Sequence, residues 1–442
     1  MSSAVGATRV VDGNSVTPTS YVVAKAILNT NSGLELDISN VVNRFYIIES
    51  INNPFLEMDI QIVDGANLLE EHKINGNEKI SITIQRNPIK NSEQNKIKWE
   101  LNLRIAEVFG YVKDLPTKQF YKFKCVSEHL YINASKTLVK PFDGTIGTLI
   151  KKICKDDLKI KKFNVNTSSK NNIKGIYPRI RPIQAANWLL ENAFEDNTHF
   201  YFWESILDGV QLDSYKNLIN NKVYKKLEFK PGFKYDVGTP ESYDEQSKRI
   251  RTITGPLGMG KMAQISRGTY ASTLHTVDIA EKKYEKFFYP KNTTNKSKGD
   301  KVHKLNKEQP WNSKDKIDDQ TYDQLRNSKN YFVSLNSKAF NLDNYHGPTK
   351  PTLLKNEAHK NSLLFQNFTI TIPGDFEMKA GQIIEMDVIK SSTYEYLGEP
   401  KSMIDTYISG KYIIKKITHT FDQEFLSEVE IMRDSVGVKI NA

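Results

Sequence analysis

The chain has 442 residues, enough for about three domains at roughly 150 residues each. Hydrophobic residues make up 38% of it and charged residues 26%, and the mean hydropathy is −0.52. No apolar run approaches the roughly 20 residues of a membrane span, and the first residues lack the apolar core of a secretory signal. We therefore expect a multidomain protein with no membrane span that is assembled in a cytoplasm.

The formal net charge of +10 is unevenly distributed. Residues 281–316 hold eleven lysines against five acidic residues and contain no arginine. Nucleic-acid readers favour arginine interleaved with aromatic residues, so we interpret the stretch as a solvated, mobile insertion loop. The two cysteines, Cys125 and Cys154, are too few for a disulfide framework and lack metal-type spacing.

The first part of the chain predicts strands. Residues 1–20 are small and polar and indicate an N-terminal arm. Apolar and polar residues then alternate with the period of two that is typical of half-buried strands. The segments with this pattern are 41–51, 55–65, 75–85 and 98–108. Residues 21–115 are therefore predicted to form one antiparallel barrel or sandwich.

Residues 116–208 predict a mixed α+β middle domain. Thr145 is a candidate N-cap for a helix that places Cys154 in the core, and a second helix begins near Pro182. That helix leads into an aromatic strand at 199–205. The core residues predicted for this helix and strand are Trp188, Leu189, Phe194, Phe200 and Phe202.

Strand patterns return on both sides of a long interruption. They cover residues 222–232 and 249–260 before it, and 367–374, 381–388, 410–421 and 424–433 after it. We assign 209–265 and 361–437 to a second, discontinuous antiparallel barrel, 266–360 to an inserted domain, and 438–442 to a C-terminal tail. Within the insertion, 318–328 is a possible helix. A glycine shortly before an alternating strand occurs in both barrels, which chance explains as well as duplication does.

The sequence presents no catalytic constellation. Residues 255–262 (GPLGMGKM) begin like a phosphate-binding loop, but Met262 replaces the magnesium-holding Ser or Thr. Gly268 and β-branched residues beyond it argue against the helix that such a loop needs. The eight histidines lack metal-ligand spacing, so we read His199 as a helix C-cap and His419 as a packed or interface residue. The prediction is a structural or binding protein with no catalytic, metal or cofactor-binding residues, and no enzyme.

Two late segments, 370–388 and 409–437, resemble the closing half of the second tube-type barrel in baseplate central hub proteins of contractile-tailed (myovirus-type) bacteriophages. The most specific pattern, G-x-Y-x-I-x-x-I-x-H, is matched at Gly410, Tyr412, Ile414, Ile417 and His419. Residues 180–205, 266–284 and 44–65 are similar to the helix and aromatic strand, the inserted segment and the first barrel of the same family.

The resemblance implies a mainly β fold with two tube-type antiparallel β-barrels, an α+β middle domain and an insertion. It implies a non-enzymatic homotrimer whose six barrels form a pseudo-sixfold ring between the tail tube and the central spike. The ring would surround a channel for DNA, as passing cargo, and for the tape-measure protein, in the baseplate of the virion. Tube-initiator proteins are further expected partners. The residues expected to shape the second barrel are Pro373, Gly374, Gly381, Gly410, Tyr412, Ile414 and His419.

Two alternatives remain open from the sequence. Carboxylates facing each other across a cleft could make the chain a tail-associated cell-wall-degrading enzyme. The lysines of 281–316 could make it a nucleic-acid-binding protein, whose binding would fall steeply with salt. A secretion-system spike protein is a near neighbour of the hub interpretation.

Overall fold

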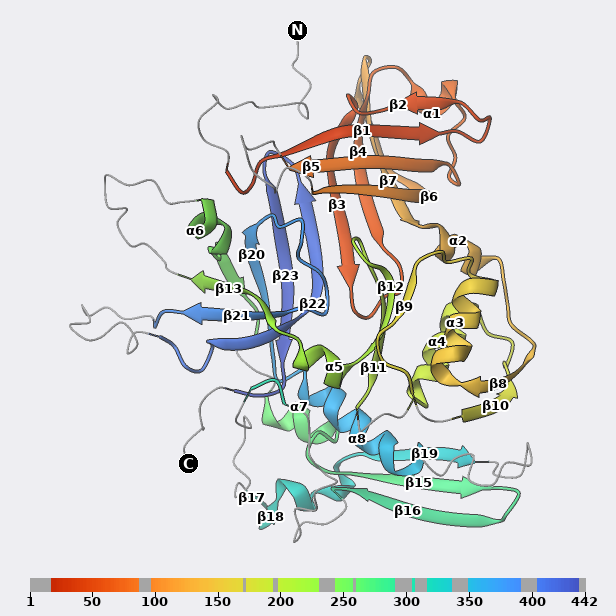
Figure 1. The fold of residues 1–442 in the computed structure, drawn as a ribbon, viewed down its shortest axis with the longest axis vertical. Coiled ribbons are helices and arrows are strands. Elements are labelled where there is room, and N and C mark those ends of the chain that lie inside the picture. Colours follow the sequence, from red (N-terminus) through yellow and green to blue (C-terminus); the bar gives the residue numbers. More distant parts are fainter. Residues whose placement is uncertain are drawn as a thin grey trace, which may run out of the picture.

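The computed structural model describes residues 17–86, 97–169, 172–193, 198–229, 243–256, 260–290, 304–306, 316–335, 349–390 and 404–436. The described chain is mainly β, with helices concentrated in the middle and in the inserted segment (Figure 1). This confirms the predicted mainly β fold with α+β parts. The domain limits drawn from the sequence stay a prediction.

Thirteen strands form one large sheet. Its first half-sheet comes from the N-terminal part of the chain. A four-residue helix, α1 (Leu68–Glu71), lies between two of its strands in the sequence. The strands of this half-sheet are β1 (Tyr21–Asn29), β2 (Glu35–Asp37), β3 (Val42–Ser50), β4 (Glu57–Asp64), β5 (Lys79–Arg86), β6 (Lys98–Leu115) and β7 (Lys118–Ser127).

The second half-sheet is assembled from both sides of the insertion, as the strand patterns predicted. A short helix, α6 (Tyr243–Lys248), lies between its first two strands. The strands are β13 (Val223–Phe229), β14 (Thr252–Thr254), β20 (Gln366–Pro373), β21 (Ile383–Val388), β22 (Gly410–Phe421) and β23 (Phe425–Arg433).

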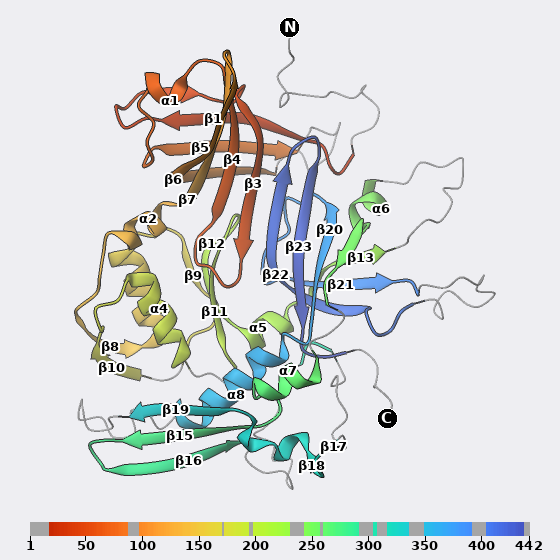
Figure 2. The ribbon, with the colours of Figure 1, turned by 180° about the vertical axis from the view of Figure 1, so that it is seen from behind.

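The two half-sheets have the same connectivity. In the first, the neighbour order is β3-β4-β7-β6-β5-β1, and in the second it is β14-β20-β23-β22-β21-β13. Corresponding strands also follow one another in the same order along the chain. In both views β1 and β5 cross β3 and β4, and β13 and β21 cross β20 and β23 (Figure 1, Figure 2). The faint sequence echo therefore corresponds to a structural repeat.

Two details differ from a pair of separate antiparallel barrels. The half-sheets are continuous with each other through the pairing of β3 with β22, and within the described residues neither is closed into a barrel. In addition, β13 pairs with β21 in parallel, whereas the equivalent strands β1 and β5 are antiparallel. Alternation along a strand shows which face is buried but not which edge is paired, so the sequence could not reveal either feature.

The middle region packs helices against two small sheets. Thr145 accepts a hydrogen bond from the amide of Thr148, and Cys154 is fully buried, both as predicted. The elements are α2 (Glu128–Ala134), β8 (Pro141–Thr145), α3 (Ile146–Lys152), a π-helical turn (Ile153–Asp157), β9 (Phe163–Val165), β10 (Asn172–Ile176), α4 (Pro182–Glu191), β11 (Phe200–Ser205), β12 (Gly209–Ser214) and α5 (Tyr215–Asn220).

The inserted segment forms a three-stranded sheet, ordered β16-β15-β19, and α8 packs on β15 and β16. Its elements are α7 (Lys261–Ser266), β15 (Ser272–Asp278), β16 (Lys283–Tyr289), β17 (Lys316–Ile317), β18 (Gln320–Thr321), two 3-10 turns (Tyr322–Gln324 and Arg326–Ser328), β19 (Asn330–Leu335) and α8 (Thr349–Ser362). The possible helix at 318–328 is thus wrong, since only single 3-10 turns form. Part of the lysine-rich stretch is a strand, β16, and most of the remainder lies outside the described residues.

Candidate functional site at the junction of the two half-sheets

The half-sheets meet along a seam, which we define as the antiparallel pairing of β3 with β22 from Lys416 opposite Ser50 to Phe421 opposite Phe45. At the end of the seam the rings of Phe45 and Phe421 stack with their centroids 4.5 Å apart. Trp99 of the first half-sheet donates its indole N–H to the carbonyl oxygen of Phe376 at 3.0 Å. One aromatic core therefore crosses from one half-sheet into the other.

The glycine and proline predicted to shape the second barrel lie next to this core. Pro373 ends β20, and Gly374 follows it with its amide donating to the carbonyl oxygen of Phe425 at 2.9 Å. A Cβ at Gly374 would lie 2.2 Å from ring carbons of Phe425, well inside van der Waals contact. Only a residue without a side chain fits between the backbone of this turn and the buried ring.

Gly381 has a structural counterpart in the first half-sheet. It has φ +86°, and its amide donates to the carbonyl oxygen of Ile414 at 2.8 Å. Asn77 has φ 83°, and its amide donates to the carbonyl oxygen of Ile105 at the same distance. Glycine and asparagine are the residues that adopt left-handed backbone most readily. The two hairpins thus begin with the same turn. Ile105 in the first half-sheet and Ile414 in the second are therefore equivalent positions.

A buried arginine holds the start of β22. The guanidinium of Arg433 donates to Gln366 Oε1 at 2.5 Å, to the carbonyl oxygen of Ser409 at 3.0 Å and to that of Tyr407. It also lies 4.5 Å from the ring centroid of Tyr412. Gly410 has φ +133°, and a Cβ there would lie 3.0 Å from this guanidinium. Gly410 and Tyr412, both predicted from the sequence to shape this barrel, therefore lie against the guanidinium of Arg433.

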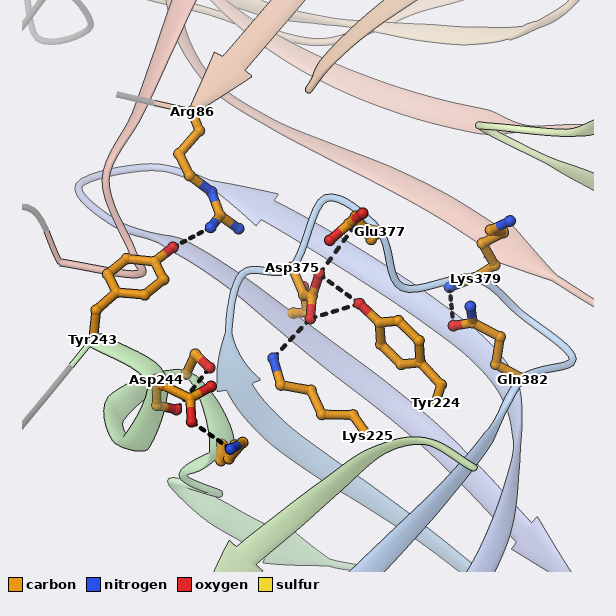
Figure 3. A network of polar contacts seen from close by, with 12 residues as sticks. Arg86, Tyr224, Lys225, Tyr243, Asp244, Asp375, Glu377, Lys379 and Gln382 are labelled. Atoms are coloured by element: carbon orange, nitrogen blue, oxygen red, sulfur yellow. Dashed lines mark hydrogen bonds and ion pairs between the residues drawn. The ribbon is translucent and has the colours of Figure 1, made fainter. Parts of the chain in front are cut away.

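An ionic network lies beneath the seam and joins β13 to the loop after β20 (Figure 3). Asp375 accepts hydrogen bonds from Lys225 Nζ at 2.8 Å and from the Tyr224 hydroxyl at 3.0 Å. Burial alone would raise the pKa of Asp375, but the ammonium of Lys225, the amide of Glu377 and the hydroxyl of Tyr224 together hold the pKa below its usual value. Nearby, Arg86 of the first half-sheet donates to the hydroxyl of Tyr243 in the second (Figure 3).

Glu49 lies at the point where both half-sheets meet the middle region. Its carboxylate accepts hydrogen bonds from the amide of Ile206 at 2.9 Å and from the amide of Ala380 at 2.7 Å. The side chain is fully buried, and this burial raises the pKa of Glu49 to about 7 despite the two amide donors. Beside it, Lys379 pairs with Asp208 at 2.6 Å. One carboxyl therefore connects three segments that are distant in the sequence.

His419 is fully buried, as its strand pattern predicted. Its Nδ1 is 2.9 Å from Ser427 Oγ, and its ring meets Trp99 edge-on at 4.8 Å between centroids. Burial lowers the pKa of His419 to about 3, so the imidazole is neutral in the folded protein. Ile414, from the same motif, is also fully buried.

The helix-capping role predicted for His199 is wrong. α4 ends at Glu191 with Asn192 as its C-cap, and His199 instead precedes β11. The buried imidazole stacks on Tyr215, with centroids 5.2 Å apart, and neither ring nitrogen has a hydrogen-bond partner among the residues that the structure describes. His199 also lines a cavity of about 740 Å³ bounded by α4, β11, β19 and α8. The apolar spacing of this helix continues in the sequence beyond Glu191, where α4 ends, so the C-cap was predicted too far along the chain.

The predicted core of the middle region is largely in place. Leu189, Phe200 and Phe202 are buried in one cluster, and Trp188 is half-buried against it. Phe194 lies outside the described residues. Sequence patterns locate such residues because burial follows the helix and strand periods.

No metal site is found in the described ranges. No group of three or more His, Cys, Asp or Glu residues there is placed to hold a metal ion. The helix that we argued against does form, as α7, which begins within this motif at Lys261, but it has six residues, and Met262 in its first turn is 84% exposed. Residues 257–259 lie outside the described part. No helix in that part is long and apolar enough to cross a membrane.

Sequence reasoning missed the three charged residues that organise the junction: Glu49, Asp375 and Arg433. Each stands at a place where the alternation predicts an unremarkable strand or turn residue. Their importance comes from burial between segments that are distant in the sequence. The one local signal was a charged residue on the apolar face of a strand, as at Glu49 in β3.

The arrangement of two equivalent half-sheets, joined edge to edge beside an α+β region, is similar to the fold of solved phage tail proteins. The tail protein from Neisseria meningitidis MC58 superposes with a TM-score of 0.54 at 11% identity, covering 94% of this chain and 98% of that one. The 43 kDa tail protein of prophage MuSo2 from Shewanella oneidensis gives 0.51 at 9% identity, covering 93% and 98%. The resemblance to phage tail proteins is thus confirmed at the level of the fold. No family model and no curated protein matches the sequence.

Proposed function

We propose that the chain is a non-enzymatic structural protein of a virion tail and forms the central hub of a contractile baseplate. Three copies would assemble into a ring that seats the tail tube or tube-initiator proteins on one side and the central spike on the other. DNA and the tape-measure protein would pass through its channel. The fold shared with tail proteins over nearly the whole chain supports this role.

The observation that carries the proposal is the repeated connectivity of the half-sheets. A sixfold tube can be matched by a threefold ring only if each chain supplies two similar units. The seam places the two units side by side in one chain, so three chains would present six units in succession. Closed cyclic symmetry is the usual arrangement of a homo-oligomer with repeated heterologous contacts.

The test is the mass of the purified protein across a concentration series, measured by light scattering or mass photometry. A species of three times the 50.6 kDa chain mass is expected. A stable dimer or tetramer, or a monomer at every concentration, would contradict the ring. Digestion of purified peptidoglycan by the same preparation would contradict the non-enzymatic role.

A further inference from the structure

The three-stranded sheet of the inserted segment, β16-β15-β19, has one buried face and one exposed face. α8 packs on β15 and β16, and Leu274 and Thr276 of β15 are 1% and 2% exposed. Because successive residues of a strand point to opposite faces, the residues between them lie on the other side of the sheet. The sheet lies at the end of the molecule opposite β1 and β2 (Figure 1, Figure 2).

The strand register identifies the residues of the exposed face, which we call the outer face. β15 pairs antiparallel with β16 and parallel with β19, so His275 lies between Lys286 and Phe332. The outer face consists of Thr273, His275, Val277, Tyr284, Lys286, Phe288, Asn330, Phe332 and Ser334. The turn Arg326–Ser328 borders it at one end, where the Thr273 hydroxyl donates to the carbonyl oxygen of Arg326.

Three rings form a stack across the outer face. The imidazole of His275 stacks on Phe332 with centroids 4.6 Å apart and on Tyr284 with centroids 5.9 Å apart. Its Nδ1 is 2.6 Å from the hydroxyl of Tyr284, and its Nε2 is 3.3 Å from Asn330 Oδ1. Phe332 is 75% exposed, and among the described strands none pairs with β19 on the side away from β15. The stack is thus held in place and ends in a ring whose far side is open.

The outer face also carries positive charge. Lys286 Nζ lies 5.8 Å from the ring centroid of Tyr284, and the guanidinium of Arg326 lies 4.9 Å from that of Phe288. The two acidic residues of these three strands, Asp278 and Glu285, alternate onto the other face. Cations beside exposed rings, on a face without carboxylates, favour an anionic ligand that has flat rings of its own.

A single-stranded nucleic acid has this chemistry. Its unpaired bases stack on aromatic side chains while its phosphates pair with lysine and arginine. Sheets that bind RNA use exposed aromatic rings in the same way. A double helix keeps its bases stacked on one another and has none to offer the open side of Phe332. An acidic protein would match the cations, but the open ring stack matches a base more closely.

We propose that the outer face binds single-stranded nucleic acid, with a base stacked on the open side of Phe332 and phosphates beside Lys286 and Arg326. This activity goes beyond the hub function and does not depend on it. Lys286 belongs to the lysine-rich stretch 281–316, so the proposal gives a defined surface to the nucleic-acid binding that the sequence left open.

The test is fluorescence anisotropy of the purified full chain with labelled oligothymidylate and oligouridylate of about 15 nucleotides. Binding of either strand supports the proposal, and the tighter of the two identifies the sugar of the natural ligand. A duplex of the same length is expected to bind about tenfold more weakly, because its bases cannot stack on Phe332.

Substitutions of Phe332 test the stacking directly. Phe332→Ala is expected to weaken binding about tenfold. Phe332→Trp should keep the affinity, and the fluorescence of the new indole should be quenched by the stacked base. The matched control is Tyr111→Ala, which removes a 55% exposed ring from β6 and should leave the affinity unchanged. All these side chains are exposed, so each variant should keep the parental circular dichroism spectrum.

The salt dependence separates this site from a general attraction to lysines. For single strands, the logarithm of the binding constant falls with that of the salt concentration by about 0.7 per phosphate contact. Lys286→Gln should therefore reduce this slope by about 0.7. Lys316→Gln removes an exposed lysine of the same stretch from β17 and should leave the slope unchanged.

Four results would overturn the proposal. They are no binding of either oligonucleotide, equal or tighter binding of the duplex, an equal effect of Phe332→Ala and Tyr111→Ala, and an equal effect of Lys286→Gln and Lys316→Gln. If Phe332→Ala leaves oligonucleotide binding unchanged but lowers the mass of the assembled protein, the outer face is a contact between copies instead. The hub proposal is tested by the mass of the unaltered chain, so it can stand when this one falls.

Discussion

Gly374→Ala tests whether the seam depends on a glycine at this turn. The backbone of Gly374 is not left-handed, so the only new cost is the contact of the added methyl group with Phe425 at 2.2 Å. Carbon atoms pack at about 3.5–4.0 Å, so the ring must move by more than 1 Å. Phe425 is fully buried and stacked 4.3 Å from Phe421, which leaves it no free direction. We expect a loss of about 3 kcal/mol in the free energy of unfolding, at the upper end of the range for overpacking.

The assay is urea unfolding followed by tryptophan fluorescence, since Trp99 lies 6.1 Å from Phe425 and reports on this core. The matched control is Gly65→Ala, whose Cβ would meet only ordinary contact at 3.5 Å. Phe425→Leu creates space, so Gly374→Ala should cost at least about 1 kcal/mol less in that background. If Gly374→Ala behaves like Gly65→Ala, or costs the same with either residue at 425, the steric reasoning is refuted.

Three other substitutions test the charged residues of the junction. The pKa of Glu49 is raised from 4.5 to about 7, so the folded state holds a proton that the unfolded chain releases. The free energy of unfolding should therefore fall by about 3 kcal/mol as the pH rises through this window. Glu49→Gln should flatten the dependence, measured by urea unfolding at several pH values, and an unchanged slope would contradict the assignment. Arg433→Met removes the guanidinium that donates to the carbonyl oxygens of Ser409 and Tyr407, and leaves Gln366 Oε1 with the more distant hydroxyl of Tyr412. It should cost about 3 kcal/mol in thermal or urea unfolding, and a neutral result would mean that water replaces the guanidinium. Asp375→Asn leaves the ammonium of Lys225 without its counterion and should cost about 2–4 kcal/mol at neutral pH. Because the pKa of Asp375 is lowered from 3.8, the stability it contributes is present above that pH and lost as the pH falls through the folded value, so the variant and the parent should converge in acid.

Several elements could be predicted because the information for them is local. The strand at 410–421 was visible as β22 from its alternation, and the helix that starts at Pro182 was visible from its apolar period. Thr145 was identifiable as an N-cap because a hydroxyl before an apolar run satisfies a free amide of the first turn. The 3-10 turns at Tyr322–Gln324 and Arg326–Ser328 were mistaken for a helix, since polar spacing alone does not supply the apolar face that stabilises one.

The sequence by itself determined most strands of the large sheet, which of their faces are buried, and that an insertion separates the strands of the second half-sheet. Alternation and glycine positions carry that information residue by residue. Only the tertiary structure decided that β3 pairs with β22, that the half-sheets share one connectivity, and that Glu49, Asp375 and Arg433 become buried between them. The physical reason is that edge pairing and burial of a charge depend on which distant segments meet. That choice is made by the free energy of the whole packed chain rather than by any local pattern.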